Sequence, residues 1–464
     1  MSVQNFRYFE SHTEASCIGV ASRSQRTTRP SFVRAMSPAS SSTRRCFMNP
    51  GSDMPCGAAS SETGWLPSPS ASSTPRRVGS ASAPKTRSST ASSYLTIRFS
   101  IHARPPPVKE SPCPRPYNAR VADRPFEGLT PDAVLDALES VGLRGDGRLL
   151  GLNSYENRVY QALLEPPADA PRGAPSPAVV AKFYRPSRWS DAQILEDHAF
   201  SMELAGREIP VVAPMSIGNA TLHEFKGFRF AVYPRRGGRT PELEDPKVLE
   251  WIGRFLGRIH AVGGAGRFRS RPALTPKTFG DEPREWLLAS GLIPPDLRPI
   301  WEGVSAEALE RARRAFEDNP PRAIRLHGDC HVGNILWTEP EERGGEMRGG
   351  PHFVDLDDAR TGPAAQDLWM LLAGDRETAA RQLKHLLDGY ERFHPFDHRE
   401  LALLEPLRTL RLIYYAAWIG RRWDDPAFPA AFPWFGSARY WQDRILELRE
   451  QTAAMDEPPL APQI

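Results

Sequence analysis

The spacing of apolar residues changes once along the chain, and this change limits the folds that the sequence can form. Before residues 234–238, short apolar or alternating runs are separated by turn residues, which is typical of antiparallel strands. After this segment, apolar residues recur at three- and four-residue spacing over long stretches, which indicates helices. The sequence therefore predicts an α+β fold in which a hinge joins a small antiparallel sheet to a larger, mainly helical part.

The individual elements follow from the same patterns. Thr130, Pro131 and Asp132 predict the start of a short helix, and Ser190 can cap another that runs to about Ala205. Strands of the sheet are expected at 149–152, 158–164, 179–184, 220–224 and 228–233. Helices of the second part are expected at 248–262, 306–316, 368–372, 379–393, 401–423 and 440–454. Two short strands, 335–337 and 352–356, are expected around a charged, glycine-containing loop at 338–350.

The first 124 residues have a different composition from the rest. They are rich in Ser, Pro and Arg without sustained periodicity, so we predict a disordered extension at 1–124, followed by a sheet domain at 125–236 and a helical domain at 237–464. An organellar transit peptide or a translated leader upstream of the true start would also explain this composition. Residues 1–104 carry a net charge of +9, whereas the whole chain carries +3. The remainder is therefore mildly acidic, which argues against a nucleic-acid partner.

Cysteine usage and hydropathy bear on the cellular setting. The five cysteines show no pairing framework and no metal-ligand spacing, which favours a reducing, cytoplasmic environment. No apolar run approaches the roughly 18–20 residues that span a bilayer, so we expect no membrane association. Nothing in the sequence requires an oligomer, and a monomer is expected.

The strongest chemical signal lies between Arg325 and Trp337. Asp329 is followed five residues later by Asn334, in a loop that leads into a short apolar strand. This spacing matches the kinase catalytic loop, where the aspartate accepts the proton of the acceptor hydroxyl and the asparagine binds Mg²⁺. Phosphoryl transfer depends mostly on positioning, so the base and the metal ligand are expected on one rigid loop.

A second carboxylate follows at the expected distance. Asp355 lies 21 residues beyond Asn334, at the end of an apolar run. Mg²⁺ prefers oxygen ligands and in nucleotide sites takes only a few from the protein. Asn334 and Asp355 are therefore the predicted magnesium ligands.

Upstream residues are candidates for holding ATP. Lys182 lies inside an apolar strand, where its charge is costly unless phosphates or a carboxylate meet it. The following helix offers Glu196 as first choice and Asp197 as second choice for the lysine–glutamate ion pair of kinases. Residues 152–160 occupy the place of a glycine-rich loop but contain no glycine; Ser154 is expected to contact the phosphates there.

Neighbouring residues are expected to have structural roles. His327 is predicted to support the backbone of the loop, and Asp367 to brace the loop by hydrogen bonds. Cys330 could be a redox-sensitive thiol, but a small buried filler is the preferred interpretation.

These motifs resemble a known family. Residues 327–334 with Asp355 resemble the aminoglycoside, choline and homoserine phosphotransferase superfamily, which has a bilobal protein-kinase-like fold. A closer resemblance, to the stress response kinase A family, covers nearly all of residues 128–460. It is carried by the segments 152–160, 182–186, 193–196, 325–337, 353–360, 366–372, 425–429 and 432–434.

The resemblance implies an ATP- and Mg²⁺-dependent cytoplasmic Ser/Thr protein kinase that acts in stress survival. It places the proton acceptor on Asp329, the magnesium ligands on Asn334 and Asp355, and an ATP contact on Ser154. The motif is shared with kinases of small hydroxyl compounds, and a non-catalytic nucleotide-binding module is a further alternative. Because little chain separates Asp355 from Gly362, we also predict activity without activation-loop phosphorylation.

Overall fold

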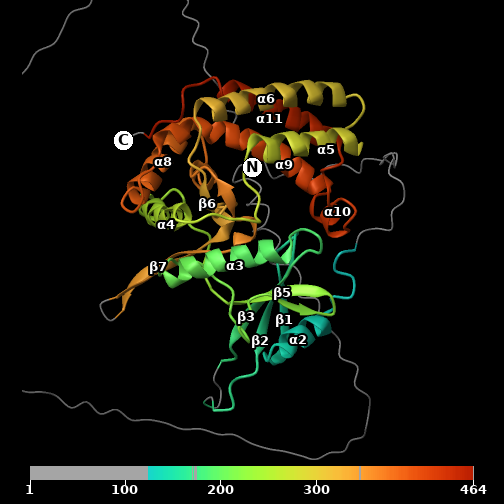
Figure 1. Cartoon of the computed structure of the whole chain (residues 1–464), viewed down its shortest axis with the longest axis vertical. Helices are drawn as coiled ribbons and strands as arrows, with labels where there is room; N and C mark the ends of the chain where they lie inside the picture. Colours follow the sequence, from blue (N-terminus) through green and yellow to red (C-terminus); the bar gives the residue numbers. More distant parts are fainter. Residues whose placement is uncertain (1–123, 170, 172–174, 344–345, 463–464) are drawn as a thin grey trace, which may run out of the picture. The chain divides into compact units, whose positions relative to one another are not determined.

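The computed structural model describes residues 124–169, 171, 175–343 and 346–462 (Figure 1). The extension predicted at 1–124 lies outside these residues, except for Arg124. The described residues belong to one compact unit. Its elements confirm the expected α+β fold, since a five-stranded antiparallel sheet is followed mainly by helices. Within the described ranges, no helix has the length and hydropathy needed to cross a membrane.

The sheet has the strand order β1-β2-β3-β5-β4. Its strands are β1 Gly145–Leu152, β2 Arg158–Leu164, β3 Ala178–Phe183, β4 His223–Phe225 and β5 Phe228–Pro234. Helix α2, Pro131–Ser140, begins where Thr130 Oγ1 accepts a hydrogen bond from the Ala133 N–H. Its buried face packs with apolar residues of β2, β3 and β5, including Phe183 and Phe230. The strand expected at 220–224 is shorter and starts only at His223.

Helix α3, Asp191–Gly206, connects the sheet with the helical part. Ser190 and Gln193 form the capping box at its start, as the sequence predicts. Near this end, Ile194 packs with Tyr184 of the sheet. Farther along, Phe200 and Leu204 belong to the large core of the helical part. A single helix thus packs on the sheet at one end and on the large core at the other, and Asp197 between these ends lies near Lys182.

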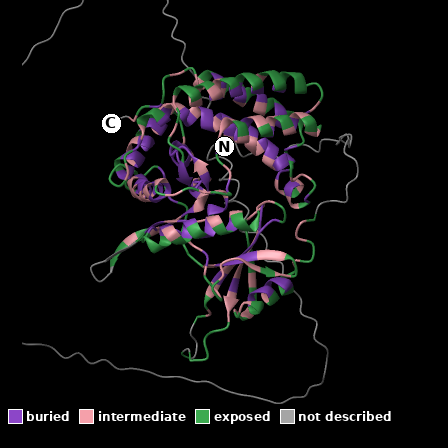
Figure 2. Ribbon diagram, viewed as in Figure 1, coloured by how far each residue is buried: buried purple, intermediate pink, exposed green. Residues whose placement is uncertain are grey.

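The remaining helices enclose the large core, whose buried residues are purple in Figure 2. They are α4 Pro246–Gly264, α5 Glu282–Ser290, α6 Arg298–Asp318, α7 Ala365–Trp369, α8 Arg376–Tyr390, α9 Leu404–Gly420, α10 Ala427–Ala431 and α11 Ala438–Ala454. Helices α4 and α8 pack very closely, because a side-chain carbon at Gly253 or Gly257 would overlap the backbone of α8. The short helices α5 and α10 were not predicted from the sequence.

Two small pairs of antiparallel strands flank the segments that contain Asp329 and Asp355. Strand β6, Ile324–Leu326, pairs with β9, Arg360–Gly362, and β7, Ile335–Arg343, pairs with β8, Glu346–Phe353. The prediction of a loop at 338–350 is wrong, because strands β7 and β8 extend through most of this segment. Strands that pair through their backbone groups do not need an apolar pattern along their whole length. Gly349 and Gly350 have positive φ angles opposite an irregularity in the pairing.

Candidate active site

The catalytic loop runs from β6 to β7 and is held by a buried aspartate. The Asp367 carboxylate accepts hydrogen bonds from the backbone N–H groups of His327 and Gly328, both at 2.8 Å, and from His260 Nε2 at 3.0 Å. Burial raises the pKa of Asp367, but the hydrogen bond from His260 and the other partners lower it below its usual range. The predicted bracing role of Asp367 is confirmed.

Two further contacts fix this loop against the segment after β8 that contains Asp355. His327 Nε2 lies 2.9 Å from the carbonyl oxygen of Val354, so His327 supports the backbone as predicted. Gly328 has a φ angle of +85°, and a side-chain carbon there would overlap the Asp358 carbonyl. Glycine is therefore required at this close approach.

Asp329 and Asn334 are brought together within the loop. The Asn334 side-chain amide donates to the Asp329 carbonyl oxygen at 2.9 Å, which orients the amide and leaves its oxygen as the atom that can bind a metal. The Asn334 carbonyl in turn accepts from the Val354 N–H at 3.0 Å. The base, one expected metal ligand and the strand before Asp355 are thus linked by consecutive hydrogen bonds.

The Asp329 carboxylate, which remains partly exposed, has two basic neighbours. Arg411 Nη2 of α9 lies 2.7 Å from its Oδ1, and His331 Nε2 lies 3.7 Å from its Oδ2. Burial lowers the pKa of His331 more than the nearby carboxylates raise it, so this ring is neutral at pH 7. The permanent positive charge beside Asp329 therefore comes from Arg411.

Asp355 follows β8 in a conformation that is uncommon for aspartate. Its φ and ψ are both 60°, in the left-handed region, which costs free energy and persists only where the surroundings enforce it. Its side chain is 52% exposed, and its Oδ1 lies 2.7 Å from Lys182 Nζ of β3. The structure therefore brings together the predicted phosphate-binding lysine and the predicted metal ligand.

Lys182 is buried and keeps its charge. Its ammonium group also lies 3.4 Å from Asp357 Oδ1. Burial lowers the pKa of Lys182, but Asp355 and Asp357 raise it more, so the pKa lies above its usual range. A cation held in this way can be shared with nucleotide phosphates.

The expected ion pair between Lys182 and Glu196 is wrong. Glu196 instead accepts hydrogen bonds at 2.7–2.9 Å from the backbone N–H groups of residues 269–271. These bonds hold the segment whose Arg271 side chain donates to the carbonyl groups of Asp357 and Ala359. Glu196 thus supports the loop after Asp355 from a distance.

Asp197, the second choice, is the acid of α3 that faces the cluster. It is buried, and both Arg271 and Lys182 act on its charge. Burial raises its pKa to about 7, against the lowering effect of these two cations. Adjacent residues on a helix point about 100° apart, which explains why Glu196 and Asp197 have different surroundings.

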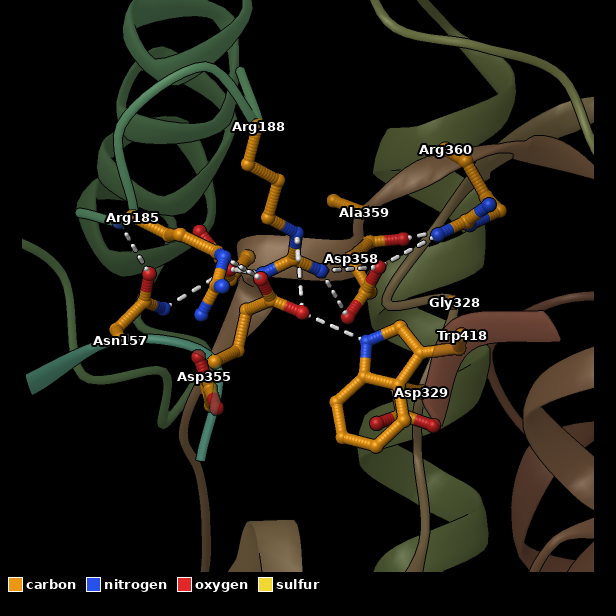
Figure 3. A network of polar contacts seen from close by, with 12 residues as sticks. Asn157, Arg185, Arg188, Gly328, Asp329, Asp355, Asp358, Ala359, Arg360 and Trp418 are labelled. Atoms are coloured by element: carbon orange, nitrogen blue, oxygen red, sulfur yellow. Dashed lines mark hydrogen bonds and ion pairs between the residues drawn. The ribbon is translucent and has the colours of Figure 1, made fainter. Parts of the chain in front are cut away.

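Behind Asp355, two further carboxylates form a buried network with arginines (Figure 3). Arg188 pairs with Asp357 and, at 2.9 Å, with Asp358, while Arg360 Nη2 lies 2.7 Å from Asp358. Burial raises the pKa of Asp357, but Lys182 and Arg188 lower it to about 2. The pKa of Asp358 is also well below its usual range, because Arg188 and Arg360 outweigh burial.

The turn between β1 and β2, residues 153–157, is held by residues of the helical part. Ser154 is half-buried within it. The Glu156 carboxylate accepts a hydrogen bond from Trp418 Nε1 at 2.6 Å, and Arg422 Nε lies 2.6 Å from the same oxygen. We call residues 153–157 the phosphate turn, after the role that the sequence predicts for Ser154. Trp418 of α9 thus supports this turn.

Asn157 and Arg185 add a second set of contacts at the phosphate turn. The Asn157 side chain accepts from the Arg185 N–H at 3.0 Å and donates to Asp357 at 3.1 Å. The Arg185 guanidinium lies 2.7 Å from Asp425, which precedes α10. The sequence reasoning assigned no role to these residues or to Glu156, Arg188, Arg411 and Arg422.

The residues present fit a magnesium ion that is shared with a nucleotide. Asn334 and Asp355 offer an amide oxygen and a partly exposed carboxylate, which are the ligand types that Mg²⁺ prefers. Among the described residues, no group of three or more His, Cys, Asp or Glu side chains could hold a metal ion. An ion at this place would need phosphate and water oxygens to complete its coordination.

Cys330 lies next to Asp329 but is not exposed. It is a free cysteine with no exposed surface, and burial together with nearby carboxylates raises the pKa of its thiol. A thiol in this state is a poor nucleophile, so its surroundings agree with the filler role expected from the sequence.

A base on a braced loop, an amide–carboxylate pair and a buried lysine, set on a small sheet and a helical part, define a kinase-like phosphotransferase. Comparison with known proteins agrees with this class. Residues 149–404 match the model of the phosphotransferase enzyme family. Stress response kinase A of Escherichia coli (strain K12) is 44% identical over 335 residues, which cover 72% of this chain and 96% of that protein.

Two further comparisons extend this result. Serine/threonine protein kinase RdoA of Salmonella typhimurium (strain LT2) is 43% identical over 335 residues, with the same coverage. An aminopropanol kinase associated with a microcompartment shares the fold, with a TM-score of 0.52 and 15% identity over 69% of this chain and 98% of its own. The chain belongs to the phosphotransferase enzyme family and, within it, to the stress response kinase A family.

Proposed function

We propose that this protein is an ATP- and Mg²⁺-dependent kinase that phosphorylates Ser or Thr hydroxyl groups of proteins. The observation that carries the proposal is the chain of hydrogen bonds from Asp329 through Asn334 to Val354, which joins the expected base to one expected metal ligand and to the residue before the other. The name of the relative in Salmonella typhimurium, a serine/threonine protein kinase, supports protein as the acceptor.

Each site residue has a distinct role in this proposal. Asn334 and Asp355 would hold Mg²⁺, which supplies positive charge that neutralises the ATP phosphates. Lys182 would contact the phosphates through the ammonium group that now pairs with Asp355. Ser154 and the backbone of the phosphate turn would contact the phosphates from the sheet.

The transfer itself requires one proton movement at Asp329. The hydroxyl oxygen of the acceptor forms a bond to the γ-phosphorus while the bond from that phosphorus to the β–γ bridging oxygen breaks, and ADP leaves. The proton of the hydroxyl passes to the Asp329 carboxylate. The fixed backbone of the catalytic loop keeps the carboxylate in place for this step.

The arginine pairs of Asp357 and Asp358 support activity without activation-loop phosphorylation. In many protein kinases a phosphate pairs with arginines to order the segment after the metal-binding aspartate. Here two built-in carboxylates already pair with Arg188 and Arg360. Full activity is expected from protein that carries no phosphate, as checked by mass spectrometry; a requirement for prior phosphorylation would contradict this.

The proposal is tested by transfer of labelled phosphate from ATP with the full chain. Label is expected in proteins of a bacterial extract only when Mg²⁺ is present, and Asp329→Ala should lower turnover by ~10²–10⁴-fold with ATP affinity little changed. Undiminished turnover of this variant would refute the role of Asp329.

The same assay separates this function from the two alternatives, a small-molecule kinase and a non-catalytic nucleotide-binding module. Label in a small hydroxyl compound, with none in protein, would show a small-molecule kinase instead. ATP binding without transfer to any acceptor would favour a non-catalytic module, although such a module has no use for a braced base. We also propose a cytoplasmic monomer, which sedimentation of the purified chain and cell fractionation would test.

A further inference from the structure

Arg411 is the residue that holds the catalytic carboxylate from outside its own loop. Its guanidinium Nη2 lies 2.7 Å from Asp329 Oδ1, and it comes from the middle of α9, 82 residues farther along the chain. No local motif marks it, and the sequence reasoning assigned it no role. Its position is notable because the carboxylate that it contacts is the proposed proton acceptor.

The surroundings of Arg411 make this pair specific. The arginine is largely buried, and burial alone would lower its pKa, but Asp329 and Asp358 raise it more. Asp358 is already paired with Arg188 and Arg360. Asp329 is therefore the carboxylate that remains for Arg411. Burying the guanidinium costs free energy, and its ion pair with Asp329 offsets part of that cost.

Helix α9 also links the base with the phosphate turn. Arg411, Tyr415, Trp418 and Arg422 follow one another at spacings of four, three and four residues, which places them on one side of the helix and its end. Arg411 contacts Asp329 at one end of this row, while Trp418 and Arg422 contact Glu156 at the other. One rigid element thus fixes both the acceptor side and the donor side of the site.

We propose that Arg411 is a positioning residue for phosphoryl transfer, which holds the Asp329 carboxylate in the orientation that receives the acceptor proton. This inference rests on the proposed function. A guanidinium nitrogen 2.7 Å from one carboxylate oxygen restricts the side-chain rotation of the aspartate through their ion pair and leaves the second oxygen to face the acceptor hydroxyl. Lysine would supply the charge but not the planar geometry.

The test measures ATP turnover of the full chain with water as acceptor, because this readout does not require the natural substrate. Arg411→Ala is expected to lower kcat by roughly 10–10²-fold, the usual cost of a misplaced catalytic group, with KM for ATP changed by less than about threefold. Added guanidinium ion should restore part of the lost kcat, and Arg411→Lys should lie between the wild type and the alanine variant.

A matched control lies one turn earlier on the same helix. Arg408 pairs with Glu405 rather than with the active site, so Arg408→Ala should keep wild-type kcat and should not respond to guanidinium. Thermal unfolding of each variant separates positioning from packing: Arg411→Ala should unfold within a few degrees of Arg408→Ala.

Three outcomes would overturn the inference. The first is a wild-type kcat in Arg411→Ala. The second is a loss of kcat in this variant with an equal loss of ATP affinity. The third is a folded Arg411→Ala variant whose kcat guanidinium ion does not restore. If the wild type hydrolyses ATP but labels no protein, the proposed acceptor is wrong while the result on Arg411 stands. If the wild type turns over ATP neither with water nor with protein as acceptor, both proposals fail.

Discussion

The catalytic loop and the phosphate turn are both short irregular segments, yet they are held in different ways. The catalytic loop is fixed mainly through its backbone, by Asp367 and by short strands on either side. The phosphate turn is fixed through its side chains, by Trp418 and Arg422 from the far end of α9. The group proposed for the chemical step is therefore held by a rigid backbone, whereas the proposed nucleotide contact depends on side-chain contacts between distant parts of the chain.

The hydrogen bonds that hold the backbone of the catalytic loop should contribute a large share of the free energy of unfolding. Asp367→Ala leaves two buried N–H groups and His260 without their acceptor, so the free energy of unfolding should fall by about 3–5 kcal/mol. Asp388→Ala, which removes a pair with Lys384 on the surface of α8, should cost less than about 1 kcal/mol. Denaturant unfolding measures both, and equal losses would show that Asp367 does not carry the loop.

The phosphate turn should respond in ATP affinity rather than in the chemical step. Arg422→Ala removes a contact with Glu156 but leaves the hydrogen bond from Trp418, so KM for ATP should rise roughly 3–10-fold while kcat at saturating ATP changes less than about twofold. Arg421→Ala is the matched control, since Arg421 lies over the Trp286 ring instead. A loss of kcat without a change in KM would mean that the turn acts on transfer itself.

A smaller effect is expected for the pH dependence of stability, through Asp197 of α3. Burial raises the pKa of Asp197 from 3.8 to about 7, despite Arg271 and Lys182. A raised pKa in the folded state contributes stability at low pH that is lost as the pH rises from about 4 to about 7. Asp197→Asn removes this loss.

Thermal unfolding at several pH values provides the measurement. The melting temperature of Asp197→Asn relative to the wild type should therefore increase between pH 5 and pH 8. Asp191→Asn, at the exposed start of the same helix, gives the baseline. A difference that stays constant with pH would show that Asp197 is not buried in its acidic form.

The sequence predicted what local patterns encode. The capping box at Ser190, the strands around Lys182, and the spacing of Asp329, Asn334 and Asp355 are all short-range signals. The Trp418–Glu156 contact joins residues 262 positions apart, and Arg185 contacts Asp425 over 240 positions. No single-sequence pattern specifies which arginine meets which carboxylate over such distances.

The errors have physical causes of the same kind. Glu196 and Asp197 are both acids of one helix, and only the rotation of α3 against the sheet decides which of them faces Lys182. The charged residues at 338–350 suggested a loop, because strands that pair only with each other do not need the apolar alternation of a half-buried sheet. In both cases the missing information is tertiary packing.

The most direct test of the account is a crystal structure of the full chain with Mg²⁺ and AMP-PNP, a non-hydrolysable ATP analogue. We expect a metal ion bound by the Asn334 side-chain oxygen and the Asp355 carboxylate, Lys182 on the phosphates, and Asp329 facing the γ-phosphate from the acceptor side. A nucleotide bound elsewhere, or a metal ion that contacts neither Asn334 nor Asp355, would contradict it.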